Sequence, residues 1–345
     1  MIPGFYPRYS RNGASSRHRF YDMADLWTAA AGCEVRCRPF FSERHLEKLY
    51  AGKGKSLAGL AAGWLRRLAE LPSMPDTAVI EYELLPFFPA WFERRALRRR
   101  RYYLNFDDDV ALKYRRIPWL ARKYDRLAAH ASGVICANRM LLDRFRAINP
   151  NVLLLPTAID LAPFRSVPSP QKFDRFTVVW IGSPSTFGYL LNAADKLREM
   201  AQKNDFELLV IAKASLPPVP GVRCRMADWS EPAEAELLRR SHVGIMPLPE
   251  GDAFAAGKSA FKLIQYAAAG LPAIASDIGE NRHVLRNGET GFLAGTCGEW
   301  ADALAKLAQD SARYRKMAAA ALAESEKYSL EAAFEKFRSF ISGNR

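Results

Sequence analysis

The stretch GKSAFKLIQYAAAGLPAIAS, residues 257–276, decides the fold of the second half of the chain. Its apolar residues Phe261, Ile264 and Ala268 follow a helical spacing, and Gly270 is a typical helix stop. The apolar run at 272–276 then predicts a short buried strand. The stretch therefore predicts one helix-to-strand step of an alternating α/β chain.

The same stretch begins with Gly257, Lys258 and Ser259, which resemble the end of a phosphate-binding P-loop. A P-loop needs another glycine five residues before this Gly-Lys-Ser. Asp252 holds that position, and Gly251 lies one residue too early. The earlier Gly-Lys-Ser at 54–56 fails in the same way. The spacing therefore argues against a P-loop ATPase or GTPase.

Length and composition limit the class of protein. The chain has 345 residues, which favours two domains, and its 49% hydrophobic and 25% charged residues are typical of a soluble globular protein. The sequence shows neither an apolar run of about 18 residues nor a secretory signal. Five cysteines are scattered without C-x-x-C spacing. We therefore expect a reduced, cytoplasmic protein with no metal site.

The net charge of +13 is uneven along the chain. Residues 1–165 contain 28 Lys and Arg against 16 Asp and Glu, whereas residues 166–345 contain 22 against 21. This asymmetry predicts that the first half meets an anionic partner, such as a phospholipid surface, a lipid pyrophosphate or nucleic acid. The first half has no recognisable nucleic-acid-binding module, so we expect no nucleic-acid partner.

Strands and helices alternate along both halves, which is typical of mostly parallel sheets. The pattern predicts an α/β fold of two doubly wound, Rossmann-like domains that face a central cleft. The Pro-rich segment 162–174 is the expected linker, so we place the domains at 1–165 and 166–329. Ligands of such sheets bind outside the carboxyl ends of the strands. Among the expected elements are a helix over 15–32 and strands over 34–40, 77–84, 101–109, 133–139, 152–160, 176–182, 206–212, 222–229 and 242–248.

Several blocks in order along nearly the whole chain resemble one enzyme family. They are SSRHRFY, IEYELLPFFP, NFDDD, LPTAID, WIGSPST, GIMPLP, GKSAFKLIQYAAAGLPAIAS and NGETGFLAG. The chain resembles retaining, family-4 glycosyltransferases of the GT-B fold, in a variant subset with a GK…KLIQY donor motif. The resemblance implies that the helix at 330–345 packs back onto the first domain. It also implies a role in bacterial surface polysaccharide or glycoconjugate synthesis, on a glycan or lipid-linked acceptor.

The chain departs from the family pattern in three places. Gly257 and Gln265 stand where two glutamates are usual, the strand-end Arg of the second domain is absent, and Asp107–Asp109 replace a first-domain His. These changes leave the sugar, the nucleotide and catalytic details open. The donor is expected to be UDP- or GDP-linked, with no cofactor.

The second domain is expected to hold the donor. Lys258 and Ser259 at a helix start, with Lys262 one turn on, would stabilise the leaving diphosphate without a metal. The resemblance implies that Gln265 contacts the ribose. The remaining donor candidates are two strand-exit loops, namely Gly182, Ser183 and Thr186, and Gly279, Glu280 and Asn281. For the second loop, capping of the next helix is the alternative.

Acidic residues in the basic first domain are expected at the acceptor. Asp107 or Asp108 is predicted to act as general base or to stabilise the anomeric carbon, and with Lys258 they form the expected catalytic set. An Asp-rich capping turn is the alternative. The expected acceptor contacts are Arg17, His18, Glu81, Glu83 and Asp109. Strand alternation predicts one shared face for Glu81 and Glu83.

The basic run FERRALRRRRYY (92–103) and the apolar segment 56–72 predict a peripheral contact with the inner face of the cytoplasmic membrane. A solvated helix is the alternative. Other functions stay open on this fold: a nucleotide-sugar epimerase or hydrolase, or a non-catalytic scaffold.

Overall fold

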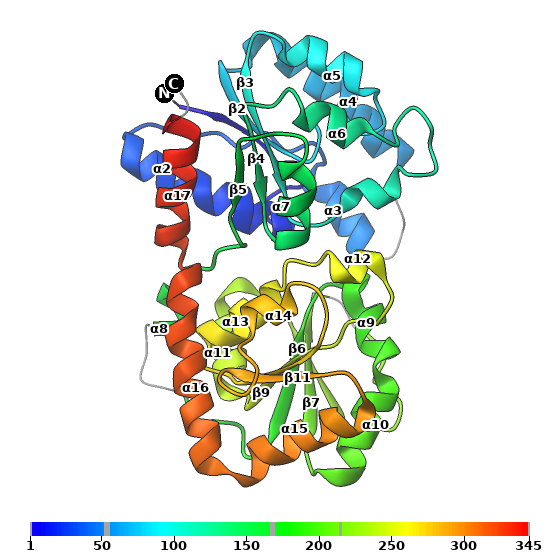
Figure 1. Cartoon of the computed structure of the whole chain (residues 1–345), viewed down its shortest axis with the longest axis vertical. Coiled ribbons are helices and arrows are strands. Elements are labelled where there is room, and N and C mark those ends of the chain that lie inside the picture. The colour runs from blue at the N-terminus through cyan, green and yellow to red at the C-terminus, as the bar shows by residue number, and fades with distance from the viewer. Residues whose placement is uncertain (1, 52–55, 166–169, 214–215, 344–345) are drawn as a thin grey trace. The chain divides into compact units, whose positions relative to one another are not determined.

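The computed structural model describes residues 2–51, 56–165, 170–213 and 216–343 (Figure 1). The chain forms two compact units, Met1–Ala158 with Leu330–Arg345, and Ile159–Ser329. The boundary therefore lies before the expected one at 165/166. Of the expected linker, Ala162–Arg165 form helix α8, and 166–169 lie outside the described residues.

The first unit is built on a five-stranded sheet in the order β1-β2-β3-β4-β5, and each neighbouring pair is parallel. The strands are β1 (Gly4–Tyr6), β2 (Thr77–Glu81), β3 (Arg101–Phe106), β4 (Gly133–Cys136) and β5 (Val152–Leu154). The helices are α1 (Ala14–Ser16), α2 (Asp22–Ala31), α3 (Glu43–Tyr50), α4 (Leu57–Glu70), α5 (Ala90–Leu97), α6 (Lys123–Ala128), α7 (Arg139–Arg146) and α17 (Leu330–Gly343). A π-helical turn, η1 (Arg17–Tyr21), joins α1 to α2, and the 3-10 turns are η2 (Leu71–Ser73) and η3 (Val110–Lys113).

Helices cover both faces of this sheet, because successive strand residues point to opposite sides. On one face Ile80 and Leu104 pack with residues of α5, α6 and α7. On the other face Val79 and Tyr103 pack with α2 and with Phe337 of α17. In Figure 1 the red α17 lies along the blue α2. The last helix thus packs onto the first unit, as the resemblance implied.

The second unit is built on a six-stranded parallel sheet in the order β11-β10-β9-β6-β7-β8. The strands are β6 (Thr177–Ile181), β7 (Glu207–Ala212), β8 (Cys224–Asp228), β9 (Val243–Met246), β10 (Ala273–Ser276) and β11 (Gly291–Ala294). Besides α8, the helices are α9 (Phe187–Asn192), α10 (Ala194–Lys203), α11 (Glu231–Arg240), α12 (Ala253–Ala256), α13 (Phe261–Ala268), α14 (Asn281–Val284), α15 (Cys297–Gln309) and α16 (Ser311–Ser325). The 3-10 turns are η4 (Pro184–Thr186) and η5 (Glu326–Tyr328).

This second sheet is also buried on both faces. Val179 and Leu209 pack with α11 and α13, whereas Val178 and Leu208 pack with α10 and α15. The predicted α/β class with two doubly wound parallel sheets is therefore confirmed. None of the described helices is long and apolar enough to cross a membrane.

Local predictions failed where the sequence signal was weak. Residues 34–40, predicted as a strand, form none, and Cys37 makes only an isolated bridge to Phe5. Phe5 belongs to the short strand β1, which the sequence did not predict. The predicted helix 15–32 contains the π-helical turn η1. The predicted helix 259–270 begins later, at Phe261, because Ala260 has a left-handed backbone with φ of 54°.

A buried ion network fixes the loop that follows β2. The Nζ atom of Lys123 lies 2.6 Å from carboxylate oxygens of both Glu83 and Glu93, and it donates to the Leu85 carbonyl at 2.7 Å. Burial acts to raise the pKa of Glu83, but the charges of Lys123 and Arg8 outweigh it and hold that pKa below its usual value. The network therefore ties α5 and α6 to the exit of β2.

Replacing Lys123 by Met should destabilise the first unit by about 3–5 kcal/mol, because Glu83 and Glu93 would remain buried without their shared cation. Urea unfolding at pH 7 measures this loss. The exposed Lys316→Met is the matched control and should change stability by less than about 0.5 kcal/mol. A Lys123→Met loss no larger than that of the control would contradict the role of the network.

Candidate functional site

The carboxyl edge of the second sheet gathers loops from several strands. Gly182 follows β6, Leu248 follows β9, and Asp277 follows β10. The backbone N–H of Leu248 donates to Ser276 Oγ at 2.9 Å, which ties the β9 and β10 exits together. In a parallel sheet this edge is where ligands bind.

The ring of Trp180 contacts both the loop that follows β6 and the first turn of α13. A Cβ atom at Gly182 would lie 2.5 Å from the Trp180 indole, so the ring leaves room only for glycine. Lys262 Nζ lies 5.5 Å from the centroid of the same ring. The structure thus brings Lys262 to the Gly182 loop, where the Oγ1 of Thr186 donates to the Ser183 carbonyl at 3.0 Å.

Lys258 and Ser259 lie in the turn between α12 and α13, not at the helix start that the sequence predicted. The Lys258 Nζ lies 4.4 Å from the centroid of the Phe254 ring. The β10 exit packs against the end of α12, because an added Cβ at Gly279 would lie 2.2 Å from the Ala256 carbonyl oxygen. Gly279 also has a positive φ of 53°, which favours glycine. These contacts place the β10 loop beside the turn that carries Lys258.

Gln265 is buried, and its side chain is engaged. Its Nε2 donates to Glu234 Oε1 at 2.6 Å, and the indole N–H of Trp229 donates to Glu234 Oε2 at 2.6 Å. Lys213 Nζ lies 5.8 Å from the centroid of the Trp229 ring. The sequence analysis missed this carboxylate, because Glu234 follows the helix cap Ser230 and looks like an ordinary first-turn acid.

The remaining donor candidates begin α14. Glu280 is its N-cap residue, and both Glu280 and Asn281 are buried. Asn281 Nδ2 donates to the Ser276 carbonyl at 3.0 Å, whereas its Oδ1 is a buried acceptor without a hydrogen-bond partner among the described residues. The Glu280 side chain makes no capping hydrogen bond to α14, and the Asn281 oxygen is available to a donor group.

In the first unit, Glu81 at the end of β2 is a buried carboxylate that accepts several hydrogen bonds. It accepts from Ser16 Oγ and from the Arg8 N–H, each at 2.6 Å, and from Ser15 Oγ at 3.0 Å. Burial, followed by the nearby charge of Asp107, raises the pKa of Glu81 to about 7. A carboxylate with this pKa can exchange a proton near neutral pH.

Asp107 lies next to this group at the exit of β3. It accepts a hydrogen bond from the Tyr82 hydroxyl. The buried Arg19, which the sequence analysis did not select, donates to Asn105 Oδ1 at 2.6 Å and to the Leu155 carbonyl at 2.9 Å. Burial lowers the pKa of Arg19, and Asp107 opposes this effect. An acid pair and a buried cation therefore meet at this edge.

Glu83 does not share the surroundings of Glu81, although alternation predicted one face. The strand ends at Glu81, and Tyr82 has a left-handed backbone with φ of 61°. Glu83 instead accepts from the hydroxyls of Tyr114 and Tyr124, each at 2.9 Å, in the Lys123 network. These contacts favour a structural role for Glu83.

Other first-unit candidates have local partners as well. Asp109 caps η3 and accepts from Arg144 at 2.8 Å, so the capping alternative describes it. His18 Nδ1 lies 3.0 Å from Asp22, and its Nε2 lies 3.0 Å from Arg17 Nη2. Asp108, which precedes Asp109, is half-buried, and its backbone carbonyl accepts from the Val110 N–H. Within the described ranges, no three His, Cys, Asp or Glu side chains are placed to hold a metal ion.

Residues 175–310, in the second unit, match the family model described as Glycosyl transferases group 1. This match within the second unit supports the glycosyltransferase part of the predicted resemblance. The family-4 subset and the retaining mechanism stay predictions. No curated protein matches the sequence.

Solved structures match almost the whole chain. Sucrose-phosphate synthase from Thermosynechococcus elongatus has a TM-score of 0.66 at 15% identity, over 98% of either chain. Anabaena Alr3699/HepE in complex with UDP-glucose has a TM-score of 0.68 at 13% identity, over 99% of this chain and 100% of that one. A glycosyltransferase from Rickettsia africae has a TM-score of 0.67 at 13% identity, over 100% of this chain and 99% of that one. At these identities the matches establish the GT-B fold alone.

The raised pKa of Glu81 makes a prediction about stability. The unfolded chain loses this proton near pH 4.5, whereas the folded state keeps it to about pH 7. Between these values the folded state binds more protons, so stability should fall as pH rises, by at most about 3 kcal/mol. Glu81→Gln should remove this fall, as measured by urea unfolding between pH 4.5 and 8.

The exposed Glu47→Gln serves as the control, because it removes one surface carboxylate from the same unit. It should keep the wild-type dependence on pH. Parallel curves for wild type and Glu81→Gln would show that Glu81 does not titrate in this range.

Proposed function

We propose that the protein is a glycosyltransferase that moves a sugar from a UDP- or GDP-linked donor to a glycan or lipid-linked acceptor. The observation that carries this proposal is the carboxyl edge of the second sheet, inside the matched residues 175–310. There Lys262 meets the Gly182 loop, and the Gly279 loop meets the turn of Lys258. Solved neighbours of the same fold bind UDP with glucose, or UDP-glucose.

Glycosyl transfer builds negative charge on the leaving diphosphate, and fixed positive charge stabilises it. We assign this role to Lys258 and Lys262, with the hydroxyls of Ser183 and Ser259 as further donors, while Thr186 holds the loop through its hydrogen bond to the Ser183 carbonyl. Two lysines in one small region supply the charge that the diphosphate requires, so a metal-independent reaction is part of the proposal. The β10 loop, with Gly279, Glu280 and Asn281, is assigned to the sugar, and the free Oδ1 of Asn281 suits a sugar hydroxyl.

For the acceptor we propose Glu81 and Asp107 as the pair that takes the hydroxyl proton. The pKa of Glu81 lies near the operating pH, which suits a general base. Asp108 stays the second candidate from the sequence. We further propose a retaining reaction in bacterial surface glycan synthesis, at the inner face of the cytoplasmic membrane.

Nucleoside recognition is assigned to Glu234, with Gln265 as its positioning residue. The amide N–H of Gln265 and the indole N–H of Trp229 each hold one oxygen of this carboxylate. Each oxygen has a further lone pair, which can accept from a ribose hydroxyl. In this arrangement Glu234 supplies the carboxylate that position 265 lacks.

The donor assignment predicts a thermal shift with nucleoside diphosphates. UDP or GDP at about 100 times its Kd should stabilise the wild-type protein by about 2.7 kcal/mol. Lys262→Ala should weaken diphosphate binding roughly tenfold or more, because it removes a charge-assisted contact. Binding of the matching monophosphate should change less.

The exposed Lys316→Ala is the charge-matched control and should bind like wild type. If none of the UDP-, GDP-, ADP- and CMP-linked sugars stabilises the protein, the donor assignment fails. Incubation of the protein with the donor that binds, in the absence of an acceptor, distinguishes a transferase from an epimerase. An epimerised sugar in the product would show that the protein is an epimerase.

The ribose assignment predicts a loss of discrimination. Wild type should prefer the ribonucleotide to its 2′-deoxy or 3′-deoxy analogue by about tenfold, since a lost hydrogen bond to a charged group costs about 1.5–3 kcal/mol. Glu234→Gln should bring this ratio close to one, as measured by calorimetric titration. Glu236→Gln, on the exposed side of α11, should keep the wild-type ratio. An unchanged ratio in Glu234→Gln would remove Glu234 from ribose recognition while leaving the donor site in place.

A further inference from the structure

A basic groove lies in the first unit, away from the acidic carboxyl edge. It has a volume of about 480 Å³ and is lined by Trp91, Arg94, Arg95, Leu97, Arg98, Arg100, Tyr102 and His130. Arg100 directly precedes β3, Tyr102 is the second residue of that strand, and His130 precedes β4. The groove is therefore at the amino ends of these strands, whereas Glu81 and Asp107 lie at the carboxyl ends.

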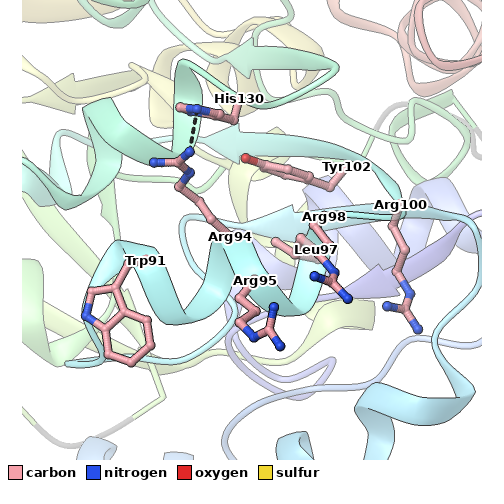
Figure 2. A pocket seen from close by; sticks show the side chains of 8 residues that line it. All are labelled: Trp91, Arg94, Arg95, Leu97, Arg98, Arg100, Tyr102 and His130. Atoms are coloured by element: carbon pink, nitrogen blue, oxygen red, sulfur yellow. Dashed lines mark hydrogen bonds between the residues drawn. The ribbon is translucent and has the colours of Figure 1, made fainter.

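Helix α5 supplies the groove with one of its faces. Trp91, Arg94, Arg95 and Arg98 follow the spacing i, i+3, i+4 and i+7, which places them on one side of a helix. The opposite side, with Ala90, Glu93 and Leu97, is buried in the unit. Figure 2 shows Arg95 and Arg98 extending from the helix while Arg94 turns toward His130. The helix is thus amphipathic, with an outer face that is cationic and aromatic.

The arginines of this groove differ in their partners. Arg100 is a structural residue, because it donates to the carbonyls of Met74, Ala96 and Leu71. Arg94 donates to His130 Nε2 at 2.6 Å, since the other ring nitrogen faces the Arg126 carbonyl at 3.2 Å.

Arg95 and Arg98 are exposed, and no carboxylate of the described residues lies within ion-pair distance of either. The groove lining contains no Asp or Glu. Two guanidinium groups therefore face solvent with their full charge, next to the oriented Arg94.

Apolar side chains are exposed on α5 itself and on α4. Trp91 is 65% exposed, and on the neighbouring α4 Leu57 and Leu65 are 83% and 70% exposed. Helix α4 adjoins the start of α5, because Trp64 donates to the Pro86 carbonyl at 2.9 Å and stacks edge-on against Phe88. Exposed indole and leucine next to arginine are the composition of surfaces that lie in a bilayer interface.

We infer that this groove binds the phosphate headgroups of anionic phospholipids and seats the first unit on a negatively charged bilayer. Arginine forks match phosphate oxygens, and Trp91 with the α4 leucines would enter the headgroup region. A nucleic acid would also meet the charge, but it leaves the exposed leucines without a partner. The inference deepens the proposed function, because it names the surface on which a lipid-linked acceptor would be met.

Co-sedimentation of the full chain with vesicles tests this inference. Wild type should bind phosphatidylcholine vesicles in which about one lipid in three is phosphatidylglycerol, and it should bind pure phosphatidylcholine at least about tenfold more weakly. Arg95→Ala/Arg98→Ala should weaken binding to the anionic vesicles about tenfold or more. Trp91→Ala should weaken vesicle binding by a smaller factor. This loss should be the same at high salt as at low salt, because it removes an apolar contact.

The control is Arg315→Ala/Lys316→Ala, which removes the same charge from exposed positions of α16. It should bind anionic vesicles like wild type. If both double variants lose the same affinity for anionic vesicles, net charge alone explains the binding, and the inference is overturned. Stronger binding to duplex or single-stranded oligonucleotides than to anionic vesicles would overturn it too, as would binding of millimolar inorganic phosphate without any vesicle binding.

The UDP and GDP thermal shift on the same preparations separates this inference from the proposed function. Arg95→Ala/Arg98→Ala should keep the wild-type shift, because neither residue belongs to the donor domain. Vesicle binding without any nucleotide shift would contradict the proposed function alone. A nucleotide shift without vesicle binding would contradict the groove assignment alone.

Discussion

Parallel pairing is the constraint on which the rest of this structure depends. All strand pairs in the described sheets are parallel, so the carboxyl ends of the strands in each unit meet at one edge. The inner strands are buried on both faces, so polar side chains gather where these strands end. Gly182, Ser276 and Gly279 meet at one such edge, and Glu81 and Asp107 meet at another. The topology thus selects which of many polar residues can act together.

The two edges differ in charge in a way that suits the two halves of a transfer reaction. The second unit presents Lys258 and Lys262 near backbone loops, as a leaving diphosphate requires. The first unit presents buried acids, and burial raises the pKa of Glu81 into the neutral range. The same first unit has a third surface at the amino ends of its strands, where arginines of α5 face solvent. The exposed arginines of α5 and the buried acid pair thus lie at opposite ends of the strands of one sheet.

Much of this was predictable from the sequence, and the failures have local causes. Apolar runs of the right length predicted most strands, since buried parallel strands leave a continuous hydrophobic signal. The three-residue β1 was too short for such a signal, and the left-handed Ala260 moved a helix start that periodicity alone placed earlier. In the site, the type of a residue was easier to predict than its partner. Glu83 binds Lys123, and Gln265 donates to Glu234. These partners lie far away in the sequence, so the sequence pattern did not predict them.

We propose that the carboxyl edge of the second sheet holds a nucleoside diphosphate. Amide hydrogen exchange of the intact protein, with and without saturating UDP or GDP, tests this proposal most directly. We predict that added protection is strongest in three segments, 181–187, 256–263 and 276–282, whose loops meet at this edge. Nucleotide-dependent protection that spares all three segments and appears elsewhere in the chain would contradict it.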